Sequence, residues 1–96
     1  MISVHRTKPQ MSVDGRRVKL SEAEHLLMVT IGMMDNRLIP ADVLIEFGLQ
    51  NPVKIQNDRN VLSQKLLRLK RKANKDFIKH IPFLGYRLTD AVEFVG

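Results

Sequence analysis

The chain has 96 residues, of which 44% are hydrophobic, enough for one core and typical of a folded globular protein. It contains no cysteine, which excludes disulfides and thiolate zinc sites, and its three histidines are scattered without ligand spacing. No segment approaches the roughly 20 continuous apolar residues of a membrane span, and the first ten residues lack a signal-peptide core. We therefore expect one soluble domain over residues 1–96, with no metal and no cofactor.

The net charge of +6 arises in one segment. Between Arg59 and Lys75 there are seven lysine and arginine residues and no acidic residue, whereas the rest of the chain has nine basic and ten acidic residues. Such a concentration of positive charge is typical of a nucleic-acid-binding element. A basic helix at a membrane surface has the same sign of charge, so charge alone does not decide between them.

The first twenty residues predict β-structure. Residues 2–5 form a short apolar run, and residues 11–13 and 17–20 form two more, joined by Asp14-Gly15. An Asp-Gly pair readily adopts the positive φ angles of a tight hairpin turn. We expect N-terminal strands within residues 1–20, including a hairpin of Met11–Val13 and Arg17–Leu20.

A helical core is predicted over residues 21–75. Ser21 and Glu24 have the spacing of a capping box, which starts a first helix. Its expected buried positions recur at helical spacing and are Ala23, Leu26, Leu27, Thr30, Ile31 and Met34. We expect this helix to end at Asp35-Asn36.

A second helix is expected after an extended Leu38-Ile39. Pro40 suits its first turn, Gly48 ends it, and Val43, Leu44 and Phe47 form its apolar face. Residues 49–57 contain Pro52 and have no helical period, which indicates a loop.

The third helix is expected over about residues 58–74, capped by Asn57 or Asp58. At about 100° per residue, four positions fall on one side, namely Leu62, Leu66, Leu69 and Ala73. The opposite side presents Asn60, Gln64, Leu67, Arg68, Arg71 and Lys75. Leu67 fits two interpretations, packing against a neighbouring element or contact with a thymine methyl group.

Residues 76–90 predict a second hairpin, with strands at 77–81 and 86–88 separated by Pro82 to Gly85. Strands, three helices and a closing hairpin in this order predict an α+β winged helix-turn-helix, in which the third helix enters the DNA major groove.

Three segments support this fold by resemblance. "VDGRRVKLSEAEHLLM" at 13–28 resembles the opening of the OmpR/PhoB-type effector domain, with Ser21 and Glu24 at the threonine and glutamate positions of its motif. "LSQKLLRLKRK" at 62–72 and "FIKHIPFLGYRL" at 77–88 resemble the recognition helix and wing of the ToxR/CadC-like transcription activators. The resemblance spans about residues 11–88.

The sequence departs from the family at two places. Phe47 occupies a packed position that is commonly tryptophan. Phe83-Leu84 lies where the wing usually carries basic residues, which casts doubt on a charged contact from the wing tip to DNA. An apolar tip could instead brace against sugar rings or a neighbouring protomer.

The resemblance implies sequence-specific binding of double-stranded DNA in transcription regulation. By position in the matched motifs, Ser63, Gln64 and Arg68 would face base edges, with Leu67 among them. Phosphate contacts would come from Lys65, Lys70, Arg71 and Lys72, and wing contacts from Lys79, His80 and Arg87. For each single lysine, a solvated surface charge is the alternative interpretation.

The family also implies partners. The loop at 48–58 can contact RNA polymerase in such activators, here through Asn51 and Lys54, although a connector without a partner is the alternative. Family practice implies paired or tandem protomers on DNA. It also implies a cytoplasmic domain, either tethered through a following membrane span or free-standing.

Other functions are less well supported. An enzyme is not indicated, because the sequence shows no nucleophile paired with a base, no phosphate-binding glycine loop and no clustered carboxylate pair. Five aromatic residues, mostly at core-like positions, argue against RNA binding by stacking. A membrane-surface helix would need a free apolar face, and the leucine stripe is more simply core. A winged helix that binds only other proteins is the remaining alternative, because fold does not dictate function.

Overall fold

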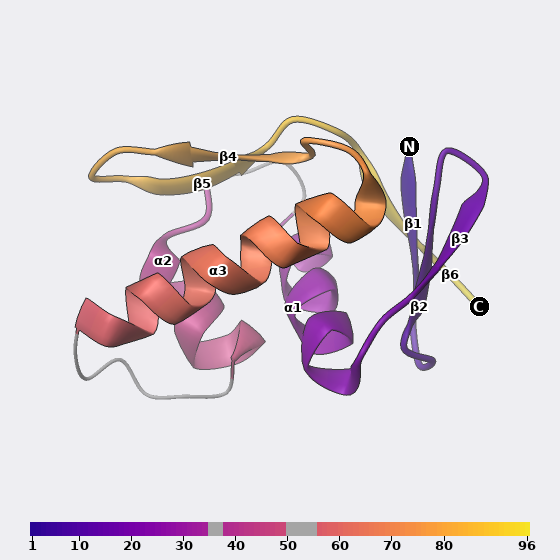
Figure 1. Ribbon diagram of the computed structural model, residues 1–96, viewed down its shortest axis with the longest axis horizontal. Coiled ribbons are helices and arrows are strands. Elements are labelled where there is room, and N and C mark those ends of the chain that lie inside the picture. Colours follow the sequence, from indigo (N-terminus) through magenta and orange to yellow (C-terminus); the bar gives the residue numbers. More distant parts are fainter. Residues whose placement is uncertain (35–37, 50–55) are drawn as a thin grey trace.

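The computed structural model describes residues 1–34, 38–49 and 56–96, with the side chains of the last range described from residue 59. Two sheets flank the helices (Figure 1). In chain order the elements are β1 (Ile2–His5), β2 (Gln10–Val13), β3 (Arg16–Lys19), α1 (Glu22–Met33), α2 (Ala41–Val43), η1 (Leu44–Gly48), α3 (Gln56–Ala73), β4 (Ile78–Ile81), β5 (Gly85–Leu88) and β6 (Val92–Val95).

The N-terminal sheet has the strand order β3-β2-β1-β6. The predicted hairpin is confirmed as β2 and β3, and its turn residues Asp14 and Gly15 have φ of 51° and 84°. Strand β6 runs parallel to β1, with Ile2 opposite Val92. No element was predicted after residue 90, because a four-residue strand whose partner lies at the other end of the chain leaves no local pattern.

Helix α1 begins with the predicted capping box. The Ser21 hydroxyl accepts from the Glu24 amide at 3.1 Å, and the Glu24 carboxylate accepts from the Ser21 amide at 2.8 Å. Leu27, Thr30 and Ile31 are buried as predicted, but Ala23 is exposed, and Met28 is fully buried instead. Since α1 contacts both the N-terminal sheet and η1, its buried surface is wider than one helical stripe.

The second helix departs from the predicted α-helical pattern. Its last turn, η1, is π-helical, with the Leu49 amide donating to the Leu44 carbonyl at 3.0 Å. A π turn contains more residues than an α turn, so positions after Leu44 are rotated relative to the predicted face. Ile45 is therefore buried, whereas Phe47, predicted to pack, is 59% exposed.

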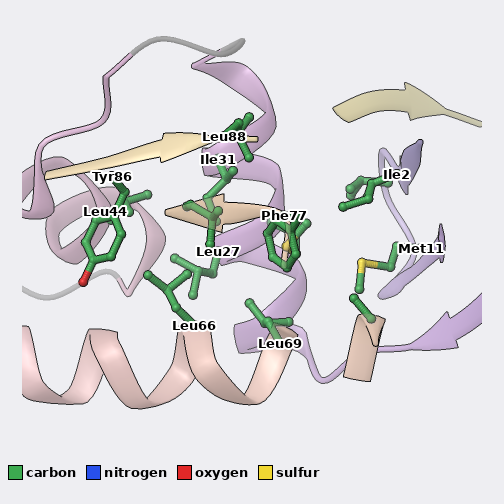
Figure 2. Packing of buried hydrophobic residues seen from close by; sticks show 14 of the residues in the cluster. Ile2, Met11, Leu27, Ile31, Leu44, Leu66, Leu69, Phe77, Tyr86 and Leu88 are labelled. Carbon is green, nitrogen blue, oxygen red and sulfur yellow. The ribbon is translucent and has the colours of Figure 1, made fainter. Parts of the chain in front are cut away.

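Helix α3 buries the predicted leucine stripe. Leu62, Leu66, Leu69 and Ala73 are all at most 2% exposed, and they contact the core around Leu27, Leu44 and Phe77 (Figure 2). The helix begins at Gln56, two residues before the predicted start. Asn57 and Asp58, predicted as caps, therefore lie within the helix and not before it.

The predicted C-terminal hairpin is confirmed as β4 and β5, which lie alongside α3 (Figure 1). Ile39, in the predicted extended segment, joins β5 through two hydrogen bonds with Tyr86, of 2.7 and 2.8 Å. Gly85 lies against the Ile39 carbonyl at a φ of 136°, where no Cβ would fit. Within the described parts of the chain, no helix is long and apolar enough to cross a membrane.

Candidate nucleic-acid interface

The face of α3 opposite the leucine stripe is open to solvent. Every predicted base-facing residue lies on it or at its border, since Ser63, Gln64 and Arg68 are exposed and Leu67 is 48% exposed. The interpretation of Leu67 as a packed residue is therefore wrong. The surface combines amide, hydroxyl, guanidinium and aliphatic groups, which are the groups that read base edges in the major groove.

The seven cations of residues 59–75 divide into two groups. Four of them pair with acids from other elements or from the chain that follows α3. The pairs are Arg59 with Asp42, Lys70 with Asp76, Lys72 with Glu24, and Lys75 with both Asp14 and Asp90. Among the described residues, Lys65, Arg68 and Arg71 have no acidic partner, so the unpaired charge of α3 is concentrated on them.

The pair of Lys72 and Glu24 joins α3 to the start of α1. The Lys72 amine lies 2.7 Å from a Glu24 carboxylate oxygen, and Glu24 is only 8% exposed. Burial opposes ionisation of Glu24, but hydrogen bonds from Lys72 and from Ser21 outweigh it and lower the pKa of Glu24. Lys72 was predicted to contact phosphate, but in this structure it neutralises a buried carboxylate.

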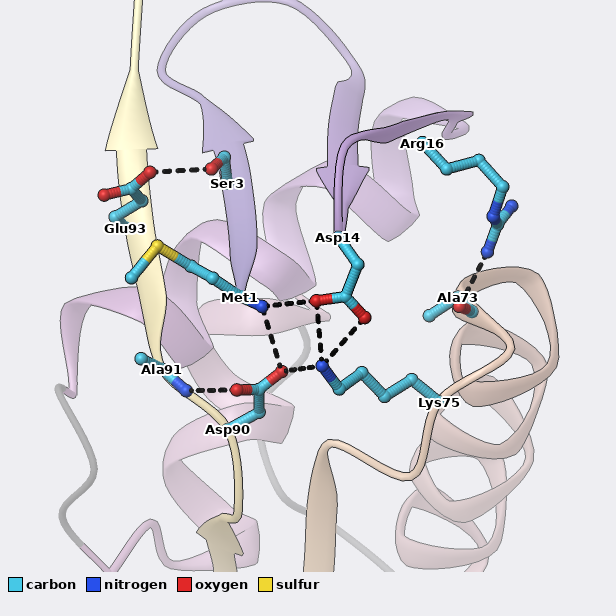
Figure 3. A network of polar contacts seen from close by, with 9 residues as sticks. All are labelled: Met1, Ser3, Asp14, Arg16, Ala73, Lys75, Asp90, Ala91 and Glu93. Carbon is cyan, nitrogen blue, oxygen red and sulfur yellow. Dashed lines mark hydrogen bonds and ion pairs between the residues drawn. The ribbon is translucent and has the colours of Figure 1, made fainter.

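The C-terminal end of α3 is fixed against the N-terminal sheet (Figure 3). The Arg16 guanidinium donates to the Ala73 carbonyl at 2.7 Å, and a cation at this end of a helix is favourable for the helix dipole. Lys75 lies between Asp14 and Asp90, at 3.0 and 2.7 Å. Lys75 was predicted on the outer face, whereas it is part of this network.

The network shifts the pKa values of its members. Hydrogen bonds from the amine of Met1 and from Lys75 lower the pKa of Asp14 to about 2. The hydrogen bond with Lys75 also lowers the pKa of Asp90, and hydrogen bonds to Asp90 and Asp14 raise the pKa of Lys75. Asp14, Asp90 and Lys75 are therefore all charged at neutral pH, and their ion pairs hold the end of α3 in place.

The predicted wing residues do not share one face of the hairpin. Lys79 lies directly opposite Arg87, and both are exposed. His80 lies opposite Tyr86 on the other face, with the two rings 5.1 Å apart. Like charges directly opposite each other destabilise a hairpin, and a bound anion would relieve this repulsion.

A notch of about 280 Å³ separates the hairpin from the first half of α3. Its polar lining comes from Arg59, Asn60 and Ser63 of α3, from His80 and Tyr86 of the hairpin, and from Asp42, which pairs with Arg59. Four residues near these contacts were not predicted as site residues, namely Arg59, Asn60, Asp42 and Arg16. The charge run included Arg59, but contacts over such separations leave no trace in sequence spacing.

The remaining predicted residues, Asn51 and Lys54, lie outside the described part of the chain. The structure therefore gives no geometry for the predicted polymerase-contact loop.

Comparison with solved structures identifies the fold. No family model matches the sequence, and no curated protein matches it significantly. The DNA-binding domain of Escherichia coli CadC superposes with a TM-score of 0.70, at 21% identity over 92% of this chain and 90% of that one. The DNA-binding domain of Klebsiella pneumoniae RstA, solved in complex with the RstA box, superposes with a TM-score of 0.68, at 20% identity over 82% of this chain and 81% of that one. The DNA-binding domain of Escherichia coli CpxR superposes with a TM-score of 0.69, at 17% identity over 88% of this chain and 83% of that one. The chain has the winged helix-turn-helix fold of these domains, as its sequence predicts.

Proposed function

We propose that this protein binds double-stranded DNA sequence-specifically and thereby regulates transcription. Helix α3 enters the major groove, and the β4–β5 hairpin contacts the adjacent backbone or minor groove. The observation that carries the proposal is the exposed face of α3. It holds Gln64, Leu67, Arg68 and Arg71 on an element whose opposite face is fully buried.

The roles within this surface follow from side-chain chemistry. Gln64 suits paired hydrogen bonds to adenine, and Arg68 suits paired hydrogen bonds to guanine. The Ser63 hydroxyl can donate or accept a hydrogen bond at a base edge, and Leu67 suits contact with a thymine methyl group. Lys65 and Arg71 contact phosphates, as do Lys79 and Arg87 on the wing, with His80 beside the notch. Lys70 and Lys72 contribute less to phosphate binding, because each already has an acidic partner.

The likeness to the CadC domain supports a more specific proposal. We infer that the chain acts in the cytoplasm as the DNA-binding part of a ToxR-like activator, tethered to the inner membrane through a segment beyond these residues. Paired or tandem protomers would bind repeated half-sites, and Asn51 and Lys54 would contact RNA polymerase. Crosslinking of single-cysteine variants at these two positions to polymerase would test that contact.

The central test is DNA binding across a salt series. Sites would be selected from a random-sequence duplex pool, and fluorescence anisotropy would compare the enriched duplex with a scrambled one. We expect a steep log-log dependence on salt, with the enriched duplex still bound where the scrambled one has dissociated. Weak binding to both with little salt dependence would contradict the proposal and favour a winged helix that binds proteins only.

A charge-matched pair of variants locates the interface. Arg68→Glu with Arg71→Glu should abolish specific binding, because it places two carboxylates against the bases and phosphates. The control, Lys8→Glu with Arg17→Glu, makes the same change in net charge at exposed positions of the β1–β2 connection and β3. Equal loss of binding in both variants would show that only overall charge matters.

A further inference from the structure

The tip of the wing carries two apolar side chains that the rest of the described chain leaves uncovered. Phe83 is fully exposed and Leu84 is 57% exposed. Their turn is closed by the Leu84 amide, which donates to the Ile81 carbonyl at 3.1 Å, and Pro82 and Phe83 are its two central residues. Phe83 is thus an aromatic residue in the hairpin turn that no described residue covers.

The backbone at Phe83 is strained. Its φ of 67° is the positive value required at the third position of a type II turn, where glycine or asparagine is usual. A bulky side chain there is a conformational outlier, and such strain persists mainly where function depends on it. No internal contact of Phe83 offsets the strain in the described structure, which points to a contact with another molecule.

The tip is also held rigidly. Directly after it, Gly85 lies against the backbone of Ile39 and Pro40, and Tyr86 forms two backbone hydrogen bonds with Ile39. The Tyr86 hydroxyl lies 3.4 Å from the Ser63 hydroxyl, which connects the hairpin to α3. Phe83 therefore projects from a fixed position relative to the recognition helix, and a rigid group loses little entropy on binding.

The charges around the tip favour DNA as the molecule that covers it. Residues 77–88 include Lys79, His80 and Arg87 and no acidic residue. The notch between the tip and α3 is lined by Arg59, Asn60 and Ser63, and the carboxylate that lines it among the described residues, Asp42, is paired with Arg59. A helix in the major groove and a tip in the adjacent minor groove are separated by one phosphate backbone. The notch lies where that backbone would pass.

We propose that Phe83, flanked by Leu84, is a wedge that enters the minor groove and partly unstacks one base step, bending the duplex. This inference rests on the proposed DNA binding and adds a second source of sequence preference. Insertion of an apolar side chain costs least at pyrimidine–purine steps, which are the most easily kinked. The protein should therefore favour such a step at a fixed distance from the bases read by α3, without a hydrogen bond to it.

The test compares Phe83→Asn with Phe83→Trp. Asparagine adopts positive φ readily, so Phe83→Asn removes the ring and the strain together. We expect its melting temperature to rise by about 4 °C, while its affinity for the selected duplex falls roughly tenfold. Phe83→Trp retains an aromatic wedge and should bind within about threefold of the wild type. A substitution that merely damaged the fold would lower both stability and affinity.

A probe in the DNA reports the wedge directly. 2-Aminopurine placed singly at successive positions beside the α3 site should brighten at one step when the wild type binds, because unstacking removes its quenching. Phe83→Asn should leave it dark, and the bend measured by energy transfer between the duplex ends should decrease. Equal affinity, brightening and bending for wild type and Phe83→Asn would overturn the inference.

Two other outcomes are distinguishable. If Phe83→Asn weakens self-association in sedimentation experiments but leaves the bend unchanged, the tip covers a second copy of the chain and the inference is wrong. If the wild type shows no specific duplex binding, the proposed function fails before any Phe83 variant is compared.

Discussion

Two neighbouring cations on α3, Arg71 and Lys72, differ in whether they pair with an acid. Arg71 is exposed and has no acidic partner among the described residues, whereas the Lys72 amine lies 2.7 Å from the Glu24 carboxylate. The two side chains point about 100° apart around the helix axis, which places Arg71 on the open face and Lys72 over the start of α1. At these adjacent positions of equal charge, Lys72 therefore contributes to stability, whereas Arg71 is available for the proposed DNA contact.

This difference predicts opposite effects of two adjacent substitutions. Arg71→Met should weaken binding to all duplexes and reduce the salt slope by about 1, with little change in the free energy of unfolding. Lys72→Met leaves the buried Glu24 carboxylate without its cation and should lower the free energy of unfolding by about 1 kcal/mol, given the partial exposure of Lys72. Fluorescence anisotropy measures duplex binding of both variants, and urea denaturation measures their free energy of unfolding. Equal changes in binding and in stability for the two variants would contradict the prediction.

The sequence could not make this distinction. The periodicity of α3 separates the leucine stripe from the open face, so Gln64 and Arg68 were predicted correctly as exposed, whereas Leu67 was left between two interpretations. Which cations are neutralised depends on acids far along the chain, since Glu24 precedes Lys72 by 48 residues and Asp14 precedes Lys75 by 61. A charge run shows where cations are concentrated but not which of them are free.

The β4–β5 hairpin depends on one glycine. Gly85 has a φ of 136° and lies against the Ile39 carbonyl, where the β5 backbone meets the segment before α2. Each element here was predicted from local patterns, namely the strand segments at 77–81 and 86–88, the break from Pro82 to Gly85 and the extended Leu38-Ile39. The contact between the two segments was not predictable, because it joins residues more than forty positions apart.

We expect Gly85→Ala to lower the free energy of unfolding by about 3 kcal/mol or more, because both the φ and the Cβ are incompatible with this contact. Chemical denaturation would measure the change. Gly15→Ala is the control: it also has a positive φ, 84°, but a Cβ there would meet no atom within 4 Å, so we expect only about 1 kcal/mol. Equal losses of unfolding free energy in the two variants would mean that the close contact at Gly85 adds nothing to the cost of its positive φ.

Elements with local determinants were predicted well, and those set by tertiary contacts were not. The capping box and the Asp-Gly turn have all their determinants within four residues. The π turn of η1 and the exposure of Phe47 follow from the way the second helix meets α1, which no local pattern encodes. Strand β6 is likewise defined by β1.

At the scale of the whole molecule, one charge network joins the chain start, the β2–β3 turn, the end of α3 and the segment after the wing. Asp14 and Asp90 contact both Lys75 and the amine of Met1 (Figure 3). The four segments surround the point where α3 ends. Loss of charge at this point would therefore loosen α3 from the N-terminal sheet.

The network predicts a loss of stability in acid. A carboxyl group with a lowered pKa in the folded state stabilises the fold above its unfolded pKa of about 4. That contribution is lost as pH falls from about 4 towards the folded value of about 2 for Asp14. We expect the free energy of unfolding to decrease over this interval, measured by urea denaturation at a series of pH values.

Asp14→Asn is the matched variant for this prediction. Asparagine tolerates the φ of 51° at this position and keeps the turn, but it cannot ionise. We expect a shallower dependence of stability on pH between about 4 and 2 and lower stability at neutral pH. An unchanged slope would show that Asp14 does not contribute to the acid transition.

The parallel pairing of β1 with β6 has a mechanical consequence. The strands are in register from Ile2 with Val92 to His5 with Val95, and Ser3 adds a side-chain hydrogen bond of 2.8 Å to Glu93. Tension applied between residues 1 and 96 would pull these strands lengthwise past each other. All their hydrogen bonds would then bear the load together, as in a shear joint, instead of opening one after another as in a zip. Helix α3 would bear no load until the pairing of β1 with β6 broke.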